Sequence, residues 1–218
     1  IASAMTASLR DLAQLTHHHS FDATQILALR ERFKQGGAAF GVDGVSIGDM
    51  VLFAAVRTLL EFPDMNAQLL EGGVMRRFRN VHLGVAVDTP RGLMVPTVFC
   101  AEQKSLARLS AEVKSLAASA RAGNISPDLL RGGTFTVSNL GTTGVESFTP
   151  IINPPQVGIL GVCGIAPRVR EGRDGLEAYP AMGLSITYDH RAVDGAPASR
   201  FAQALCKKLE QFTLLLAA

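Results

Sequence analysis

The sequence predicts an α/β fold, a two-layer sandwich in which helices pack on one mixed β-sheet. Helical and strand-like segments are mixed along the chain without the regular strand–helix–strand rhythm of a Rossmann fold. Hairpin signals at 71–73 (Glu-Gly-Gly) and 89–92 (Thr-Pro-Arg-Gly) predict that part of the sheet is antiparallel. The segment after Ser46 is apolar almost all round, which is typical of a buried helix. Because no linker or internal repeat interrupts these elements, we expect a single domain over residues 1–218.

Several segments have the apolar periodicity and the end signals of helices. Asp22 is placed to cap one helix, and Gly36-Gly37 to end it. Ser46 and Asp49 resemble a capping box at the start of the apolar helix, and Pro63 closes it. The expected helices cover residues 3–14, 22–34, 46–62, 105–122, a short stretch from 126, and 195–212.

Strands are expected where β-branched and other apolar residues lie between these helices and turns. The segments 81–87 and 93–99 should pair with each other across the turn at 89–92. The remaining expected strands cover residues 16–21, 134–138, 157–162 and 182–188.

Composition narrows the class of protein. The net charge is +2, and the 21 basic residues form no cluster, which gives little support to nucleic-acid or membrane binding. Hydrophobic residues make up 47% of the chain and charged residues 18%, and the mean hydropathy is +0.21. Such a chain has little polar material for its surface. This favours large subunit interfaces, although one efficient core remains an alternative.

The cysteines and the chain start bear on the cellular compartment. Cys100, Cys163 and Cys206 are widely spaced and form no CxxC pair, which argues against a disulfide framework or a zinc site. We expect each to be a small buried apolar residue in a reducing compartment, the cytoplasm or, in a eukaryote, the mitochondrial matrix. The sequence shows no signal peptide or transmembrane run. It begins at Ile1 without an initiator Met, so we expect it to be part of a longer protein.

His190 is the first candidate for catalysis. An apolar strand leads directly into Asp189-His190-Arg191, and Asp194-Gly195 follow where the chain enters a helix. A histidine at the exit of a buried strand is held firmly, and the ordinary histidine pKa of about 6.5 suits proton transfer at neutral pH. Asp194 could orient the ring or pair with a nearby arginine, and Gly195 would permit a tight turn. The HxxxDG pattern alone leaves a purely structural histidine as an alternative.

Ser138 is the second candidate. It ends a β-rich strand and is followed by Asn139, Leu140 and Gly141, a place from which a hydroxyl can donate to a developing oxyanion. Taken alone, these residues are equally typical of an ordinary turn. A third feature, the segment 150–156 (Pro-Ile-Ile-Asn-Pro-Pro-Gln), forces an extended entry into a buried strand.

Together and in this order, these three motifs resemble the catalytic cores of dihydrolipoamide acyltransferases, the E2 components of 2-oxo acid dehydrogenase complexes. Chloramphenicol acetyltransferase is a more distant relative with the same HxxxDG signature. The resemblance covers nearly the whole chain, since Met5-Thr6-Ala7-Ser8, the segment 21–24 and the segment 27–30 also match. Ala13-Gln14-Leu15 in place of a Pro-His pair, and the segment 144–148, are similar to the acetyl-transferring acetoin and pyruvate branch.

The resemblance implies a chloramphenicol-acetyltransferase-like, trimer-forming fold and a transferase activity. His190 would deprotonate the thiol of coenzyme A, or of dihydrolipoamide in the reverse direction. Ser138 would hydrogen-bond the tetrahedral oxyanion, and Asp194 would support the histidine loop. The acyl group, acetyl by preference, would pass directly between two thiols, so no acyl-enzyme is needed. In such a trimer, His190 of one chain would face Ser138 of its neighbour.

The resemblance also implies partners. The lipoyl group would be carried on a domain outside this chain, and the homotrimer would assemble into a cage, a 24-mer or a 60-mer, that holds the E1 and E3 components. The segment 209–216 lacks the Asp-Pro that family members carry near the last leucines, which leaves the choice between trimer and cage open. A stand-alone CoA-dependent acetyltransferase for a small-molecule acceptor and a non-catalytic scaffold subunit are the alternatives. The scaffold is disfavoured because His190 is present.

His17-His18-His19 raise the question of a metal site. On a strand, His17 and His19 share one face while His18 points to the other, so two of them at most could bind one ion. With no carboxylate partner evident, we expect strand residues at a surface or interface and no metal. We also expect His82, at the start of a strand, to be structural. Nothing near Cys163 in the sequence would activate it as a nucleophile.

Overall fold

The chain folds around a six-stranded mixed sheet whose strand order is β1-β8-β7-β6-β4-β5. This computed structural model describes residues 2–173 and 175–217. Strands β4, β6 and β7 run parallel to one another, and the other pairings in the sheet are antiparallel. The strands are β1 (Gln14–Asp22), β4 (Leu83–Val85), β5 (Thr97–Val98), β6 (Phe135–Asn139), β7 (Gly158–Gly172) and β8 (Gly175–Asp189). A separate hairpin pairs β2 (Ala67–Leu69) with β3 (Met75–Arg77) around the turn at 71–73.

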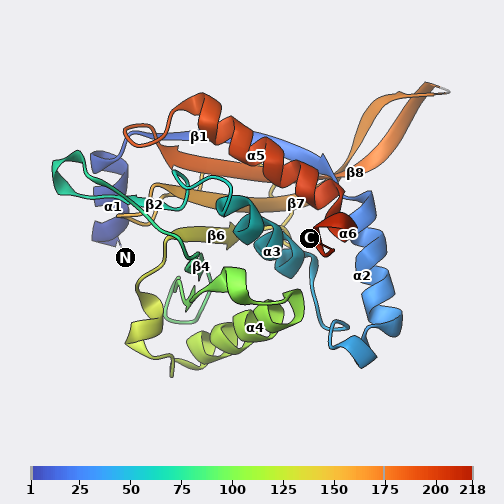
Figure 1. The fold of residues 1–218 in the computed structure, drawn as a ribbon, viewed down its shortest axis with the longest axis horizontal. Helices are drawn as coiled ribbons and strands as arrows, with labels where there is room; N and C mark the ends of the chain where they lie inside the picture. Colours follow the sequence, from blue (N-terminus) through green and yellow to red (C-terminus); the bar gives the residue numbers. More distant parts are fainter. Residues whose placement is uncertain (1, 174, 218) are drawn as a thin grey trace.

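Helices form the second layer, as the sequence predicts. Figure 1 shows α3 and α5 lying along the sheet, with α4 below them and α2 at one side. The helices are α1 (Ala2–Asp11), α2 (Thr24–Gly36), α3 (Ile47–Leu59), α4 (Leu106–Ala122), α5 (Gly195–Glu210) and α6 (Phe212–Leu215), with short 3₁₀ turns at 38–40, 71–73, 101–103 and 127–130. Among the described helices, none combines the length and the apolar run that a bilayer crossing needs. The predicted α/β sandwich with a mixed sheet is therefore confirmed.

Helix α3 forms the centre of the core. Ser46 Oγ accepts a hydrogen bond from the Asp49 amide at 3.1 Å, and the Asp49 carboxylate accepts one from the Ser46 amide at 2.8 Å. The predicted capping box is thus confirmed. Buried residues continue along the helix from Asp49 to Val56, which explains why it is apolar on every side. The pairing of 81–87 with 93–99 is also confirmed, by Leu83 opposite Val98 and Val87 opposite Met94.

The two ends of the chain differ from the expected boundaries. The first helix ends at Asp11, so Gln14 and Leu15 belong to β1, because β1 pairs with β8 over its whole length. The last long helix ends at Glu210, and α6 is a separate turn. Of the cysteines, Cys163 and Cys206 are buried as expected. Cys100 is half-buried and adopts a left-handed backbone with φ of 49°.

The largest departure from expectation is a long hairpin made by the outer halves of β7 and β8. The sequence predicts strands at 157–162 and 182–188, but the paired strands continue from Ile165 to Gly172 and from Gly175 to Met182. This hairpin projects from the body of the molecule (Figure 1). Most of its residues are exposed on both faces. A half-buried strand is predicted from alternating apolar and polar residues, and this hairpin lacks that alternation.

Candidate active site

The loop that carries His190 is fixed by Asp189, the last residue of β8. Its side chain is 1% exposed, and its carboxylate accepts hydrogen bonds from Nε and a terminal nitrogen of Arg191, the latter at 2.7 Å. The Arg191 pKa is raised by these bonds. The carbonyl of Asp189 accepts bonds from the amides of Ala192 and Val193. Asp189 therefore folds the loop onto itself. No role for Asp189 is among the sequence-based predictions, although a carboxylate two residues before an arginine at a strand end is a local signal for this pairing.

His190 stands on this loop with its backbone anchored and its ring accessible. The His190 amide donates to the Ala13 carbonyl at 2.8 Å, so the segment before β1 holds the residue in place. The side chain is 46% exposed. Its ring is tilted against the ring of Tyr188, with the centroids 5.7 Å apart. This arrangement suits a group that must exchange protons with a substrate while its position stays fixed.

Asp194 lies beside His190 at the N-cap of α5. Its Oδ1 atom is 3.8 Å from Nδ1 of His190, which is beyond hydrogen-bond range. The Asp194 side chain is 83% exposed. Within residues 2–173 and 175–217, no arginine lies within ion-pair distance of it. The structure thus places Asp194 beside the His190 ring and not beside an arginine, and its role there stays a prediction.

Gly195 is needed because a larger side chain would crowd its neighbours, and not, as we expected, because the backbone makes a tight turn there. It is the first residue of α5 and does not have a positive φ. A Cβ atom at this position would lie 3.2 Å from the Tyr188 hydroxyl and 3.6 Å from Cε1 of His17. The glycine of the HxxxDG pattern thus lets helix α5 start directly against Tyr188.

Ser138 lies on β6, on the side of the sheet away from α3 and α4. Its neighbours Val137 and Asn139 line a cavity of about 330 Å³ next to those two helices, so Ser138 points to the opposite face. Its side chain is half-buried, and its hydroxyl makes no hydrogen bond to any residue that the structure describes. A free, half-buried hydroxyl is available as a donor to a ligand.

The face that carries Ser138 is partly covered by the segment 148–156. Phe148 and Pro150 pack on Gly161, the residue opposite Ser138 on β7, where an added Cβ would lie 2.7 Å from the phenyl ring. Gln156 accepts a hydrogen bond from Thr136 Oγ1 at 2.7 Å. The segment is therefore structural, as its sequence suggested, and it also forms a wall next to Ser138.

The structure does not bring Ser138 and His190 of one chain together. Ser138 is level with Gly161 of β7, whereas Tyr188, two residues before His190, is level with Gly158. The two candidates are thus separated by roughly 15 Å along the strands and by two strand spacings, about 10 Å, across the sheet. No single reacting atom could contact both side chains.

His17 and His18 lie on opposite faces of β1, as expected. His17 contacts Tyr188 Oη through Nε2 at 3.0 Å and Ser199 Oγ through Nδ1 at 2.8 Å. His18 contacts Ser185 Oγ on the other face through Nδ1 at 2.8 Å. Burial lowers the pKa of His19, and the neighbouring histidines lower it further. The described residues contain no cluster of three His, Cys, Asp or Glu side chains that could hold a metal ion.

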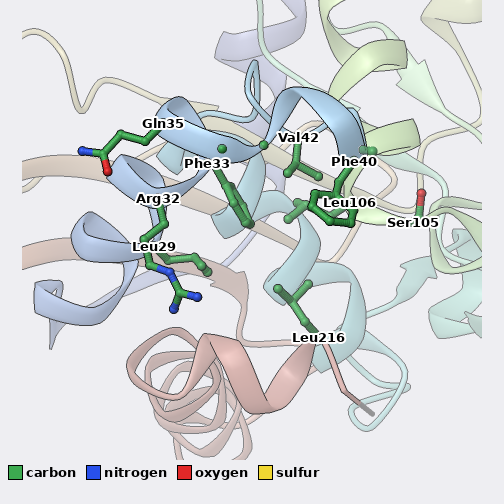
Figure 2. A pocket seen from close by; sticks show the side chains of 12 residues that line it. Leu29, Arg32, Phe33, Gln35, Phe40, Val42, Ser105, Leu106 and Leu216 are labelled. Carbon is green, nitrogen blue, oxygen red and sulfur yellow. The ribbon is translucent and has the colours of Figure 1, made fainter.

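A larger cavity, of about 770 Å³, lies away from these candidates. Figure 2 shows it between α2, the 3₁₀ turn after α2, the start of α4 and the chain end at Leu216. Its lining is mainly apolar, with Leu29, Phe33 and Phe40 prominent (Figure 2). Neither Ser138 nor His190 lines it, so it is not part of the candidate active site.

Comparisons with known proteins find relatives that match most of this chain. The dihydrolipoyllysine-residue acetyltransferase component of the pyruvate dehydrogenase complex of Mycobacterium tuberculosis is 39% identical over 213 residues, which are 94% of this chain and 38% of the relative. The corresponding component of the acetoin cleaving system of Bacillus subtilis is 37% identical over 212 residues, 97% of this chain and 53% of the relative. The chain thus spans about two fifths to one half of the length of these relatives.

Solved structures show the same fold. A structure of Azotobacter vinelandii dihydrolipoamide acetyltransferase has a TM-score of 0.93 and 36% identity, and the match covers 99% of this chain and 88% of that one. A chloramphenicol acetyltransferase has a TM-score of 0.57 at 17% identity and covers 96% of this chain and 93% of its own, which is a likeness of fold alone. The family model described as 2-oxoacid dehydrogenases acyltransferase (catalytic domain) matches residues 1–217. The chain therefore belongs to the family of 2-oxoacid dehydrogenase acyltransferase catalytic domains.

Proposed function

We propose that this chain transfers an acetyl group between coenzyme A and the dihydrolipoyl arm of a 2-oxo acid dehydrogenase complex. One observation carries the proposal. The Azotobacter vinelandii enzyme was studied for the role of one serine, one histidine and one asparagine in its catalytic mechanism. In that enzyme the serine lies 52 residues before the histidine, and the asparagine lies four residues after it. Ser138, His190 and Asp194 have the same spacing here. The acetyl group is favoured because the relatives are named as components of pyruvate and acetoin systems.

The chemistry requires one base and one oxyanion donor. His190 takes the proton from the thiol of coenzyme A, and the resulting thiolate attacks the carbonyl carbon of the acetyl-dihydrolipoyl thioester. The hydroxyl of Ser138 donates to the oxygen on which negative charge develops. When the tetrahedral intermediate collapses, the dihydrolipoyl sulfur leaves and takes the proton back from His190. The acetyl group has then moved from one sulfur to the other, and the protein is regenerated without a covalent intermediate.

The site proposed here is shared between two chains. Because Ser138 and His190 of one chain lie far apart along the sheet, each reaction centre needs His190 from one subunit and Ser138 from its neighbour. A closed homotrimer supplies three such pairs by symmetry. Further assembly into a cage is supported by the likeness to the cubic core of the pyruvate dehydrogenase multienzyme complex, with a TM-score of 0.93. The lipoyl domain and the E1 and E3 components are the proposed partners of that cage.

The test is an assay of acetyl transfer from acetyl-CoA to dihydrolipoamide by the purified chain, in which formation of the new thioester is measured over time. We expect His190→Ala to lower kcat by at least about 100-fold, the usual scale for loss of a general base. His82→Gln is the control, because the His82 ring accepts a bond from the Cys100 amide and lies outside the candidate site. Near-normal turnover by His190→Ala would overturn the mechanism. Transfer to small alcohols or amines, with none to dihydrolipoamide, would instead establish a stand-alone acetyltransferase.

A further inference from the structure

We infer that His17 is a positioning residue for His190 and acts through Tyr188. The inference rests on the proposed function, since the placement of the His190 ring matters for the rate only if that ring transfers a proton. Neither His17 nor Tyr188 is placed to touch a substrate, because Tyr188 is fully buried and both ring nitrogens of His17 contact protein hydroxyls.

Both nitrogens of the His17 ring are engaged. Nε2 lies 3.0 Å from the Tyr188 hydroxyl, and Nδ1 lies 2.8 Å from the Ser199 hydroxyl on α5. The His17 ring also meets the Tyr188 ring edge-on, with the centroids 5.1 Å apart. One imidazole thus connects an edge strand, the strand that ends at the active-site loop and the helix that begins after it.

Tyr188 is the link between His17 and His190. Its ring packs against the His190 ring, and its hydroxyl lies above Gly195, where there is no side chain to displace it. Burial, with a further contribution from the Asp194 charge, raises the pKa of Tyr188, so the hydroxyl keeps its proton at neutral pH. A phenol hydroxyl and an imidazole nitrogen can form a hydrogen bond in either direction, depending on the tautomer of the ring. That bond fixes the tyrosine ring against which the His190 ring lies.

A purely structural role for His17 makes a different prediction. If His17 only joined α5 to β1, its bond to Ser199 would matter most and the bond to Tyr188 would be incidental. Asparagine and glutamine separate the two roles, because the terminal amide of asparagine lies near the position of Nδ1 and that of glutamine near the position of Nε2. His17→Asn can reach Ser199 but not Tyr188, and His17→Gln can reach Tyr188 but not Ser199.

The experiment measures kcat and KM of the assembled full chain for acetyl-CoA and dihydrolipoamide. We expect His17→Asn to lower kcat about 10-fold, with both KM values within about 2-fold of wild type, because a displaced base slows the proton transfer and leaves binding intact. We expect His17→Gln to keep kcat within about 3-fold. Tyr188→Phe removes the same hydrogen bond and should match His17→Asn. The double variant His17→Asn/Tyr188→Phe should lose no more than either single variant.

Crystal structures of His17→Asn and His17→Gln give a result that does not depend on activity. We expect the Tyr188 and His190 rings to shift in the Asn variant and to keep their places in the Gln variant. Equal kcat losses in both variants, full activity in both, or unmoved rings in His17→Asn would overturn the inference. Wild-type protein without transfer activity would refute the proposed function instead, and the crystal structures would still decide the link between His17 and His190. If His17→Asn fails to fold, full turnover by Tyr188→Phe alone is enough to overturn it.

Discussion

Ser138 and His190 lie at opposite ends of the sheet along the strand direction. Ser138 of β6 is level with Gly161 of β7, whereas Tyr188, near the end of β8, is level with Gly158 of β7. They are separated by roughly 15 Å along the strands as well as by two strand spacings. The reaction needs a base and an oxyanion donor around one carbonyl group. Under the proposed function, a single chain would hold halves of two different sites, and the pairing of subunits would be part of the mechanism.

Hybrid oligomers test this pairing. Ser138→Ala and His190→Ala should each be nearly inactive alone, because every interface then lacks one of the two groups. Chains of the two variants that are co-expressed, or unfolded and refolded together, should regain about one quarter of the wild-type activity. Random assembly in a closed ring places an intact His190 against an intact Ser138 at about that fraction of interfaces.

The control for the hybrid experiment is a mixture of the two variants assembled separately, which should stay at the level of each variant alone. Restored activity in the co-assembled sample alone would show that the site lies between chains. If co-assembly, verified by differently tagged chains, restores no activity, then the two residues do not act across an interface.

Substitution should affect the free energy of unfolding much more at Asp189 than at Asp194. Asp189→Asn breaks the charged hydrogen bonds between a buried carboxylate and Arg191, so we expect a loss of about 2 kcal/mol in the free energy of unfolding. Asp194 makes no side-chain capping bond to α5 and its side chain is exposed, so for Asp194→Asn the change should stay within about 0.5 kcal/mol. Urea denaturation of both variants measures the difference. Equal destabilisation would show that Asp189 does not hold the loop as we describe.

Gly195→Ala tests whether the glycine is there for space. An added Cβ would come within 3.2 Å of the Tyr188 hydroxyl, so Tyr188 must shift by a few tenths of an ångström. Since the His190 ring lies against Tyr188, we expect kcat to fall about 10-fold while the protein remains folded. The matched control is Gly36→Ala at the end of α2, where an added Cβ meets nothing within 4 Å. Unchanged turnover by Gly195→Ala would contradict this reading of the HxxxDG glycine.

The parts of the fold that were predictable depend on contacts between residues that lie close together in the sequence. Ser46 and Asp49 are three residues apart and form a capping box whose geometry is local. The turn at 71–73 joins β2 to β3 across a few residues. The position of His190 just after an apolar strand was visible for the same reason, because the strand and the loop are contiguous.

The parts that were missed depend on contacts between distant residues. The outer halves of β7 and β8 are held by each other, through pairs such as Arg170 with Glu177, and carry no buried face to mark them. The role of His17 depends on Tyr188 and Ser199, more than 170 positions away in the chain, which a sequence pattern does not reveal. The spacing of Asp189 and Arg191 is local, but the burial of Asp189 comes from its place at the end of β8 between β1 and β7, which requires the sheet order.

Tyr188 should ionise at a higher pH than an ordinary tyrosine. Burial is the main cause of its raised pKa, and the negative charge of Asp194 is the second, because both disfavour the phenolate. The folded chain therefore holds this proton more tightly than the unfolded chain, in which the pKa is about 10. The resulting stabilisation is fully present below pH of about 10 and is lost as the pH rises through the folded-state value.

The phenolate absorbance of Tyr188 can be isolated as the difference between wild type and Tyr188→Phe across an alkaline titration. We expect its midpoint above the ordinary tyrosine pKa, and we expect Asp194→Asn to move it down but not to the ordinary value, since burial remains. Tyr188→Phe should also make the free energy of unfolding fall less steeply with pH in this range. A midpoint at or below the ordinary value would mean that water reaches the hydroxyl. In that case the hydrogen bond to His17 would be too weakly shielded to hold the ring under His190.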